Sequence, residues 1–299
     1  MMRYLNILLC VICLVLAGCS SDSQPEPIVD SMPHFNKSDS LTMIKIYQSI
    51  GAPWGKKWDL ADVTTWNGVT AALDVATNEI RIIGFECYQG SFTGILTDEI
   101  CKLTELRRLV ISGGTMNGTI PKHIGDLKNL ELLIIADNNV TGGIPESIGN
   151  LSNLRHLDFR NTKLYDTIPE SIGDLTNLEY LCISHTDMHG NIPKGLANLK
   201  KLRRVILTDN KLSGTFPVEI LRNDLVFECD NNNITELPFE VWNDEWDVYP
   251  PILKGNRLSG EIPEWVLKTN KWKKESCVCI GPQQKGFGYS NYSSNYSIN

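Results

Sequence analysis

The chain has 299 residues, of which 42% are hydrophobic and 21% are charged, a composition typical of globular proteins and unlike that of disordered or collagen-like chains. This length allows one or two domains with a sizeable hydrophobic core. The formal net charge is −7 at pH 7 and no long basic run is present, which argues against nucleic acid as a partner.

The first eighteen residues have the features of an export signal. Arg3 precedes an apolar run from Ile7 to Leu16, and ten residues are too few to cross the ~30 Å hydrocarbon core of a bilayer. The small residues Ala17 and Gly18 would suit an ordinary signal peptidase. We therefore expect a signal peptide over residues 1–18.

The tetrapeptide LAGC that ends at Cys19 resembles the bacterial lipobox. The resemblance implies that Cys19 is the lipidation site and becomes the first residue of an outer-membrane lipoprotein in a Gram-negative cell envelope. Two or three acyl chains, such as palmitate, would give stable anchoring, and the membrane would be contacted only through them. Residues 19–37 then form a lipidated flexible tether, and the protein faces either the cell surface or the periplasm.

Residues 38–79 have the character of an N-terminal cap. Ser38 and Asp39 resemble a helix start, and apolar residues follow at three-residue intervals. The interval predicts a helix across the end of the fold, with these residues buried: Leu41, Ile44, Tyr47 and Ile50.

A 24-residue repeat dominates residues 80–267. Leu127–Asn150, Leu151–Asp174 and Leu175–Asn198 are three successive copies, and the neighbouring segments 103–126 and 199–223 follow the same template. Less regular units precede and follow these five, which gives about eight turns. One unit is too small to fold alone, so the units must stack into a solenoid.

Each class of repeated residue has a structural task. Alternating apolar residues, such as Leu157 and Phe159, predict a short strand with one buried face. An asparagine after each strand can satisfy buried backbone groups in the following turn. These asparagines are Asn138, Asn210, Asn232 and Asn256. Asp166 interrupts a column that is otherwise glycine.

The shared pattern L-x-x-L-x-x-L-x-L-x-x-N-x-L-x-G-x-I-P resembles the plant-type leucine-rich repeat over about residues 38–267. The resemblance implies an α/β solenoid, a right-handed coil with a parallel β-sheet on its concave face and capped ends. It also implies a non-enzymatic binding role without a cofactor. Trp66–Val69 matches the W-x-G-V of the family's N-terminal cap, but Thr64 and Ala71 replace the flanking cysteines of plant members, which favours a bacterial branch.

All seven tryptophans lie outside the five regular units. They are either rings that close the two ends of the solenoid, which we favour, or platforms for stacking sugars. Residues 268–299, with Cys277 and Cys279, are expected to form a C-terminal cap and tail. No paired CxxC spacing predicts a metal site.

The outward residues of the strands are the candidate partner-binding site, because the concave sheet is where leucine-rich-repeat proteins usually bind. The middle outward column contains exposed apolar residues, and contiguous apolar patches tend to mark interaction sites. Aromatic and basic residues, which are enriched at protein interfaces, lie beside them. The candidates are Val110, Leu132, Ile134, His156, Asp158, Arg160, Tyr180, Cys182, Arg204 and Ile206. A protein partner is expected first, with a glycan as the alternative.

Two other functions remain open. In the first, the protein is a rigid rod on the cell surface that has a structural or shielding role and no dedicated ligand. A cysteine-dependent hydrolase would rest on Cys182 with His156, His185 and Asp158, but a flat open sheet offers no oxyanion site. Six cysteines remain after Cys19, and Cys87 and Cys229 among them are expected in the core, where a thiol is a small apolar filler.

Overall fold

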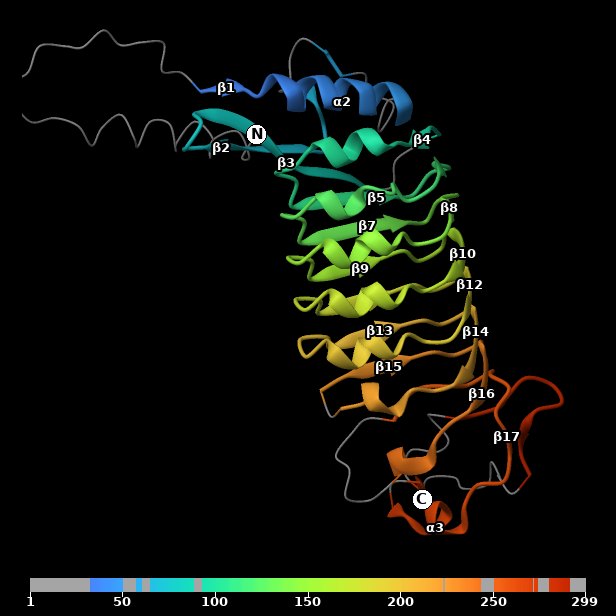
Figure 1. Cartoon of the computed structure of the whole chain (residues 1–299). Coiled ribbons are helices and arrows are strands. Elements are labelled where there is room, and N and C mark those ends of the chain that lie inside the picture. Colours follow the sequence, from blue (N-terminus) through green and yellow to red (C-terminus); the bar gives the residue numbers. More distant parts are fainter. Residues whose placement is uncertain are drawn as a thin grey trace, which may run out of the picture.

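The computed structural model describes residues 33–50, 58–60, 65–88, 93–222, 224–242, 250–270, 272–273 and 280–290. The chain winds into one elongated coil whose successive turns stack along a single axis, as Figure 1 shows. The expected signal peptide, the lipidation site Cys19, and Cys277 and Cys279 lie outside the described residues.

One face of the coil is a parallel sheet, as the repeat predicted. Within the described residues this main sheet has nine strands, and β2 (Val69–Asp74) joins it antiparallel to β3. The parallel strands, in spatial order, are β1 (His34–Phe35), β3 (Glu79–Tyr88), β5 (Arg108–Ser112), β7 (Leu132–Ala136), β9 (His156–Asp158), β11 (Tyr180–Cys182), β13 (Arg204–Ile206) and β15 (Val226–Glu228). The leucine-rich-repeat solenoid with a parallel sheet is therefore confirmed, and we call the outer side of this sheet the concave face.

A second parallel sheet, which the sequence did not predict, runs along another side of the coil (Figure 1). Its strands are β8 (Thr141–Gly142), β10 (Lys163–Thr167), β12 (Asp187–Gly190), β14 (Lys211–Thr215) and β16 (Asn233–Glu236). A short parallel pair, β4 (Ile95–Leu96) and β6 (Asn117–Gly118), lies nearer the N-terminal end. The second sheet gives each coil a second set of hydrogen bonds to its neighbours.

Short 3-10 helices complete each coil. They are η3 (Asp98–Lys102), η4 (Ile124–Asp126), η5 (Glu146–Asn150), η6 (Glu170–Asp174), η7 (Lys194–Asn198), η8 (Val218–Ile220) and η9 (Phe239–Trp242). Several of these helices begin directly after a proline, because proline fixes φ where the chain turns. Pro145, for example, directly precedes η5.

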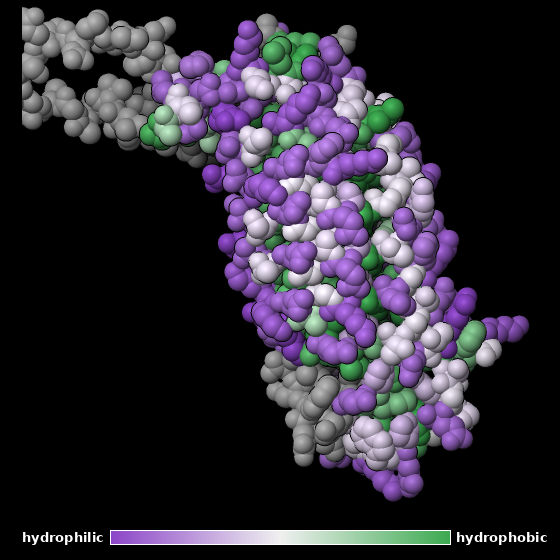
Figure 2. Space-filling model, viewed as in Figure 1, coloured by the Kyte–Doolittle hydropathy of each residue, from purple (hydrophilic) through white to green (hydrophobic). Residues whose placement is uncertain are grey.

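The face of the molecule seen in Figure 2 is mostly hydrophilic, with hydrophobic residues visible only in narrow strips.

The core is a continuous stack of apolar side chains that every coil supplies in the same way. The coil over residues 127–150 contributes seven apolar residues to the core cluster: Leu127, Leu130, Leu133, Ile135, Val140, Ile144 and Ile148. Cys87 and Cys229 are fully buried in the same core, as predicted. Cys101 and Cys182 are also buried free thiols.

The asparagine column forms the predicted hydrogen-bonded ladder. Asn232 is fully buried, and its Nδ2 donates to the carbonyl oxygens of Leu207 at 2.9 Å and Asp230 at 3.0 Å. Its Oδ1 accepts from the backbone N–H of Leu212 at 2.9 Å. Asn256 repeats this arrangement one coil later. The ladder therefore joins consecutive coils and satisfies backbone groups that water cannot reach.

Asp166 occupies the column in which the other coils have glycine, with φ at +89°. The corresponding Gly142 and Gly190 have φ of +86° and +78°. The backbone of Asp166 therefore adopts the same turn despite the cost of a side chain at positive φ. Its own Oδ1 accepts a 2.8 Å hydrogen bond from the N–H of Thr167, which partly offsets that cost.

The N-terminal end is covered by helix α2 (Lys37–Ile50), and the predicted buried stripe holds in part. Ile50 is buried, and Ile44 and Tyr47 are partly buried against the core, but the prediction for Leu41 was wrong. Leu41 is 51% exposed, whereas Met43, Ile46 and Ile50 are buried. The true stripe follows the 3.6-residue period and includes Asp39. Arg81 pairs with the buried carboxylate of Asp39 through its Nε at 2.9 Å, and this charge pairing makes an aspartate tolerable on the inner side of the helix.

Most of the described tryptophans close the two ends of the solenoid, which is the interpretation that we favoured from the sequence. Trp58 stacks between Tyr47 and Trp66, and at the other end Trp242 packs edge-on against Trp272. All four of these indoles are at most 5% exposed. Trp265, in helix α3 (Glu264–Lys268), is the exception at 51% exposed. Along the described part of the chain, no helix combines the length and apolarity needed to cross a membrane.

Candidate partner-binding site

Strand register places the predicted outward columns side by side across the main sheet. The middle column runs through the paired residues Glu86, Val110, Ile134, Asp158, Cys182, Ile206 and Glu228. The second column runs through Gly84, Arg108, Leu132, His156, Tyr180, Arg204 and Val226. The 24-residue repeat alone therefore predicted which side chains are neighbours on the concave face.

The apolar part of this surface is smaller than the sequence predicted. Leu132, Ile134 and Ile206 are partly exposed, but Val110 is fully buried. Val110 is a short side chain between the longer Glu86 and Ile134 in its column, which explains why solvent does not reach it. Val110 is therefore removed from the candidate contact residues.

His156 and Tyr180 form a stacked aromatic pair at the centre of the concave face. Their ring centroids are 4.2 Å apart and the ring planes differ by 12°. Burial lowers the pKa of His156 and outweighs the effect of the Asp158 carboxylate. Burial, helped by the negative charge of Asp158, raises the pKa of Tyr180 to about 12. Near neutral pH the pair therefore offers a flat, uncharged surface.

The basic residues on either side of this pair are already neutralised. Arg108 pairs with Glu86, with Nε 2.7 Å from Oε1, and Arg204 pairs with Glu228, with its guanidinium 2.7 Å from Oε1. All four residues lie in the two central columns. The concave face therefore presents no unpaired arginine at these positions, and its exposed guanidinium planes are held in fixed orientations.

Asp158 is buried beneath Arg160 and does not face a partner directly. Only 2% of Asp158 is exposed, and Arg160 lies above it with its guanidinium 3.3 Å from the carboxylate. The backbone N–H of Arg160 also donates to Asp158 Oδ1 at 3.0 Å. Asp158 thus positions Arg160, and Arg160 is the member of this pair that a partner could touch.

Cys182 is likewise inaccessible, with 2% of its surface exposed. Its sulfur lies 3.4 Å from Ser184 Oγ, and burial raises the pKa of the thiol. Burial therefore opposes the formation of a nucleophilic thiolate, which the hydrolase hypothesis requires, and it outweighs the opposite effect of the Ser184 hydrogen bond. No group of three potential metal ligands occurs among the described residues.

Sequence and structure comparisons agree on the family. A family model for a leucine-rich repeat region matches residues 78–245, more than half of the chain. The chain belongs to the leucine-rich-repeat family. No curated protein matches the sequence of this leucine-rich-repeat protein.

Solved structures of plant leucine-rich-repeat proteins have the same fold. The ectodomain of the Arabidopsis thaliana receptor kinase GASSHO1/SCHENGEN3, in complex with CASPARIAN STRIP INTEGRITY FACTOR 2, is 27% identical with a TM-score of 0.65, over 75% of this chain and 28% of that one. The plant peptide hormone receptor RGFR1, in complex with RGF2, is 31% identical with a TM-score of 0.53, over 56% of this chain and 27% of that one. A plant ice-binding protein is 22% identical with a TM-score of 0.64, over 85% of this chain and 78% of that one, and this shows the fold alone. The protein therefore spans less than a third of the two receptor chains.

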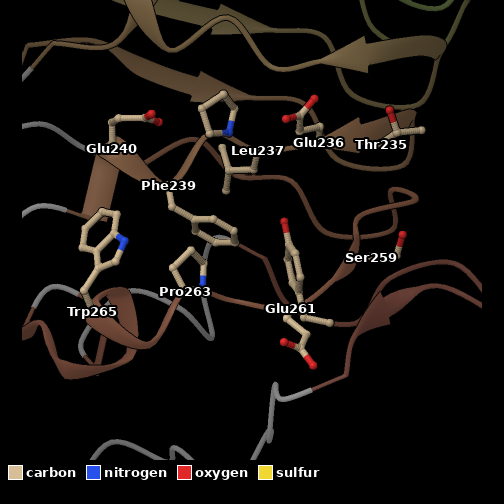
Figure 3. A pocket seen from close by; sticks show the side chains of 11 residues that line it. Thr235, Glu236, Leu237, Phe239, Glu240, Ser259, Glu261, Pro263 and Trp265 are labelled. Atoms are coloured by element: carbon tan, nitrogen blue, oxygen red, sulfur yellow. The ribbon is translucent and has the colours of Figure 1, made fainter.

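A second surface feature, absent from the sequence predictions, lies near the C-terminal end. Residues from two successive coils and from β18 (Gly288–Tyr289) line a hollow of about 480 Å³ (Figure 3). The lining includes Phe239, Trp265 and three glutamates. One sequence observation pointed towards this hollow, namely the alternative that some tryptophans are exposed platforms for a ligand. Among the described tryptophans, only Trp265 is exposed in this way.

Proposed function

We propose that this leucine-rich-repeat protein is a non-enzymatic recognition protein that binds a protein partner on its concave face. The binding surface, which we call the concave patch, comprises Leu132, Ile134, His156, Arg160, Tyr180, Arg204 and Ile206. One observation carries the proposal. Partly exposed apolar residues and the stacked pair of His156 and Tyr180 lie together on this face, beside arginines that already pair with carboxylates of the same face.

The chemistry of the concave patch favours a protein over a glycan. Leu132 and Ile134 supply branched aliphatic surface, which has few partners in a sugar but matches the apolar side chains of a protein. Tyr180 and the arginines are residue types that often dominate binding energy at protein interfaces. The GASSHO1/SCHENGEN3 ectodomain is in complex with CASPARIAN STRIP INTEGRITY FACTOR 2 and the peptide hormone receptor RGFR1 with RGF2, and this supports a polypeptide partner by analogy.

We further propose that the protein is a lipoprotein of a bacterial cell envelope, anchored through Cys19. The support is the LAGC sequence at residues 16–19 and the absence of cysteines at positions 64 and 71. Labelling cells with an alkyne analogue of palmitate should tag the wild-type protein and leave Cys19→Ser unlabelled. Equal labelling of both would contradict the anchor.

Two tyrosines give a matched test of the concave patch. Tyr180 lies on the concave face, and Tyr165 on β10 is 53% exposed on the second sheet. Partner binding should weaken by about tenfold or more in Tyr180→Ala, because a central aromatic residue is often worth ~2 kcal/mol at an interface. Biolayer interferometry of each variant against the partner, first isolated on the wild-type protein, would measure the effect.

Tyr165→Ala is the control and should bind like the wild type. Both variants should keep the far-ultraviolet circular dichroism of the wild type, since neither tyrosine is fully buried. A partner lost equally from both variants, or retained by Tyr180→Ala and lost from Tyr165→Ala, would overturn the assignment of the concave patch.

A further inference from the structure

The C-terminal hollow lies away from the concave face. Thr235 and Glu236 belong to β16 of the second sheet, Phe239 and Glu240 belong to η9, and Trp265 comes from helix α3 of the next coil. Figure 3 shows Glu236 and Glu240 on one side of the hollow, Glu261 on the other, and the Phe239 ring between them. The hollow is therefore a surface separate from the concave patch.

Three carboxylates at the hollow have no counter-charge. Glu236, Glu240 and Glu261 are exposed, and none forms an ion pair with any residue that the structure describes. The described lining contains no lysine or arginine. By contrast, Glu264, next to the hollow, pairs with Lys268 at 2.7 Å. Among the described residues, no basic side chain shields the negative electrostatic field at the hollow.

Aromatic rings form the apolar part of the lining. The centroids of Phe239 and Tyr289 are 5.3 Å apart, and Trp265 is half exposed beside them. Phe239 also packs against Trp272, which already closes the end of the core. Trp265 is therefore not needed to close the solenoid. Rings of this kind, next to carboxylates, attract a cation that is placed over their faces.

The hydroxyl of Tyr289 is a separate indication of a ligand. Tyr289 is only 8% exposed and lines the hollow, yet its hydroxyl makes no hydrogen bond with any residue in the described part of the chain. Burial, helped by the charge of Glu236, raises the pKa of Tyr289, so the hydroxyl stays protonated and neutral. The side chain is thus held in place by burial while its hydroxyl stays open to the hollow, where it can form a hydrogen bond with a ligand atom.

In the described lining, hydrogen-bond acceptors outnumber donors, and the side-chain donors are the hydroxyls of Thr235, Ser259 and Tyr289. Carboxylates only accept hydrogen bonds, and the tyrosine hydroxyl can also accept one. A neutral sugar needs both donors and acceptors from its site, whereas a guanidinium brings five donors, a positive charge and a plane that stacks on aromatic rings. We infer that the C-terminal hollow binds an arginine side chain of a polypeptide, held by the glutamates and Tyr289 and stacked on Trp265.

Fluorine NMR of the protein labelled with fluorotryptophan would test this inference. The chain has seven tryptophans, and Trp265→Phe identifies the resonance of Trp265 by its loss. Adding the peptide triarginine to the full chain should shift the Trp265 resonance saturably. Trilysine should bind more weakly, because an ammonium group cannot stack or form a two-pronged contact. Maltotriose should cause no shift.

Matched glutamine variants separate a built site from general attraction. Glu240→Gln combined with Glu261→Gln should weaken the apparent affinity for triarginine about tenfold, whereas Glu264→Gln, a neighbour outside the lining, should change it less than about twofold. No triarginine shift, equal losses in both variants, or equal binding of trilysine would each overturn the inference. A saturable shift with maltotriose in place of triarginine would overturn it as well.

Discussion

The concave patch and the C-terminal hollow present their charged groups in opposite ways. On the concave face Arg108, Arg204 and Arg160 each have a carboxylate partner, so the surface between them is apolar and aromatic. At the hollow, three glutamates lie beside the exposed Trp265 and the more buried Phe239 and Tyr289, and these glutamates have no basic partner among the described residues. The two surfaces are thus suited to different ligand groups, one apolar and one cationic.

This difference shows how a repeat shapes a binding surface. The regular coils place residues in register, so an arginine on one strand meets a glutamate on the next, as Arg204 meets Glu228 across β13 and β15. The last coils lose this regularity, and Glu236, Glu240 and Glu261 have no ion-pair partner among the described residues. We therefore expect specificity on the concave patch to come from shape and packing, and specificity at the hollow to come from charge.

Salt should separate the two surfaces most strongly. Raising NaCl from about 50 mM to about 500 mM shortens the screening length severalfold and should weaken triarginine binding at the hollow by about tenfold. Binding of the protein partner on the concave patch should change by less than about threefold, because the arginines there are already paired. Isothermal titration calorimetry at both salt concentrations measures each affinity. An equally strong salt dependence on the concave patch would show that its ion pairs open on binding.

The stacked pair on the concave face should respond to pH. Burial lowers the pKa of His156, so its value by NMR titration should lie below the ~6.5 of an unfolded chain. Because the folded pKa is the lower one, the neutral ring contributes stability above about pH 6.5, and this is lost as pH falls through the folded pKa. The loss should be below about 1 kcal/mol, because the ring is only partly buried.

Tyr180→Ala is the control for this titration. Removing the stacked ring exposes His156 to water, so its pKa should rise towards the free value. A pKa of His156 that is unchanged in Tyr180→Ala would show that the stack does not cause the burial.

The smallest effect is expected from the concave ion pairs. Arg204→Met should change the free energy of unfolding by less than about 1 kcal/mol, since Arg204 and Glu228 pair at a largely exposed position. Urea denaturation of the variant against the wild type provides the measurement. A loss above about 2 kcal/mol would mean that the pair supports the coil and is not only a surface feature.

Much of the fold and the layout of the concave face could be predicted from the sequence, whereas the C-terminal hollow could not. The 24-residue period fixed which residues are neighbours in the two outward columns and placed the buried ladder of asparagines, as Asn232 and Asn256 show. These properties depend only on register and on the need to satisfy buried backbone groups. The partner-binding role of the surviving residues remains a prediction.

Other properties depend on contacts between residues without a shared pattern. Val110, Asp158 and Cys182 point outward yet are buried, because the sizes and orientations of neighbouring side chains decide exposure. The hollow forms where β18 pairs with β17 (Ser259–Gly260), and no repeat links Tyr289 to that coil. The sequence prediction for α2 used a three-residue interval, whereas the buried side follows the 3.6-residue helical period, so it missed Met43, Ile46 and the buried Asp39.

Site-specific photocrosslinking would test the central claim most directly. A benzoylphenylalanine placed at Ile134, in the middle of the concave patch, and another placed at Tyr165, on the second sheet, probe two faces of the same coil region. In cells that carry the full chain, the account predicts a discrete crosslinked protein from position 134 and none from position 165. The same crosslinked protein from both positions, or from position 165 alone, would contradict a partner seated on the concave face.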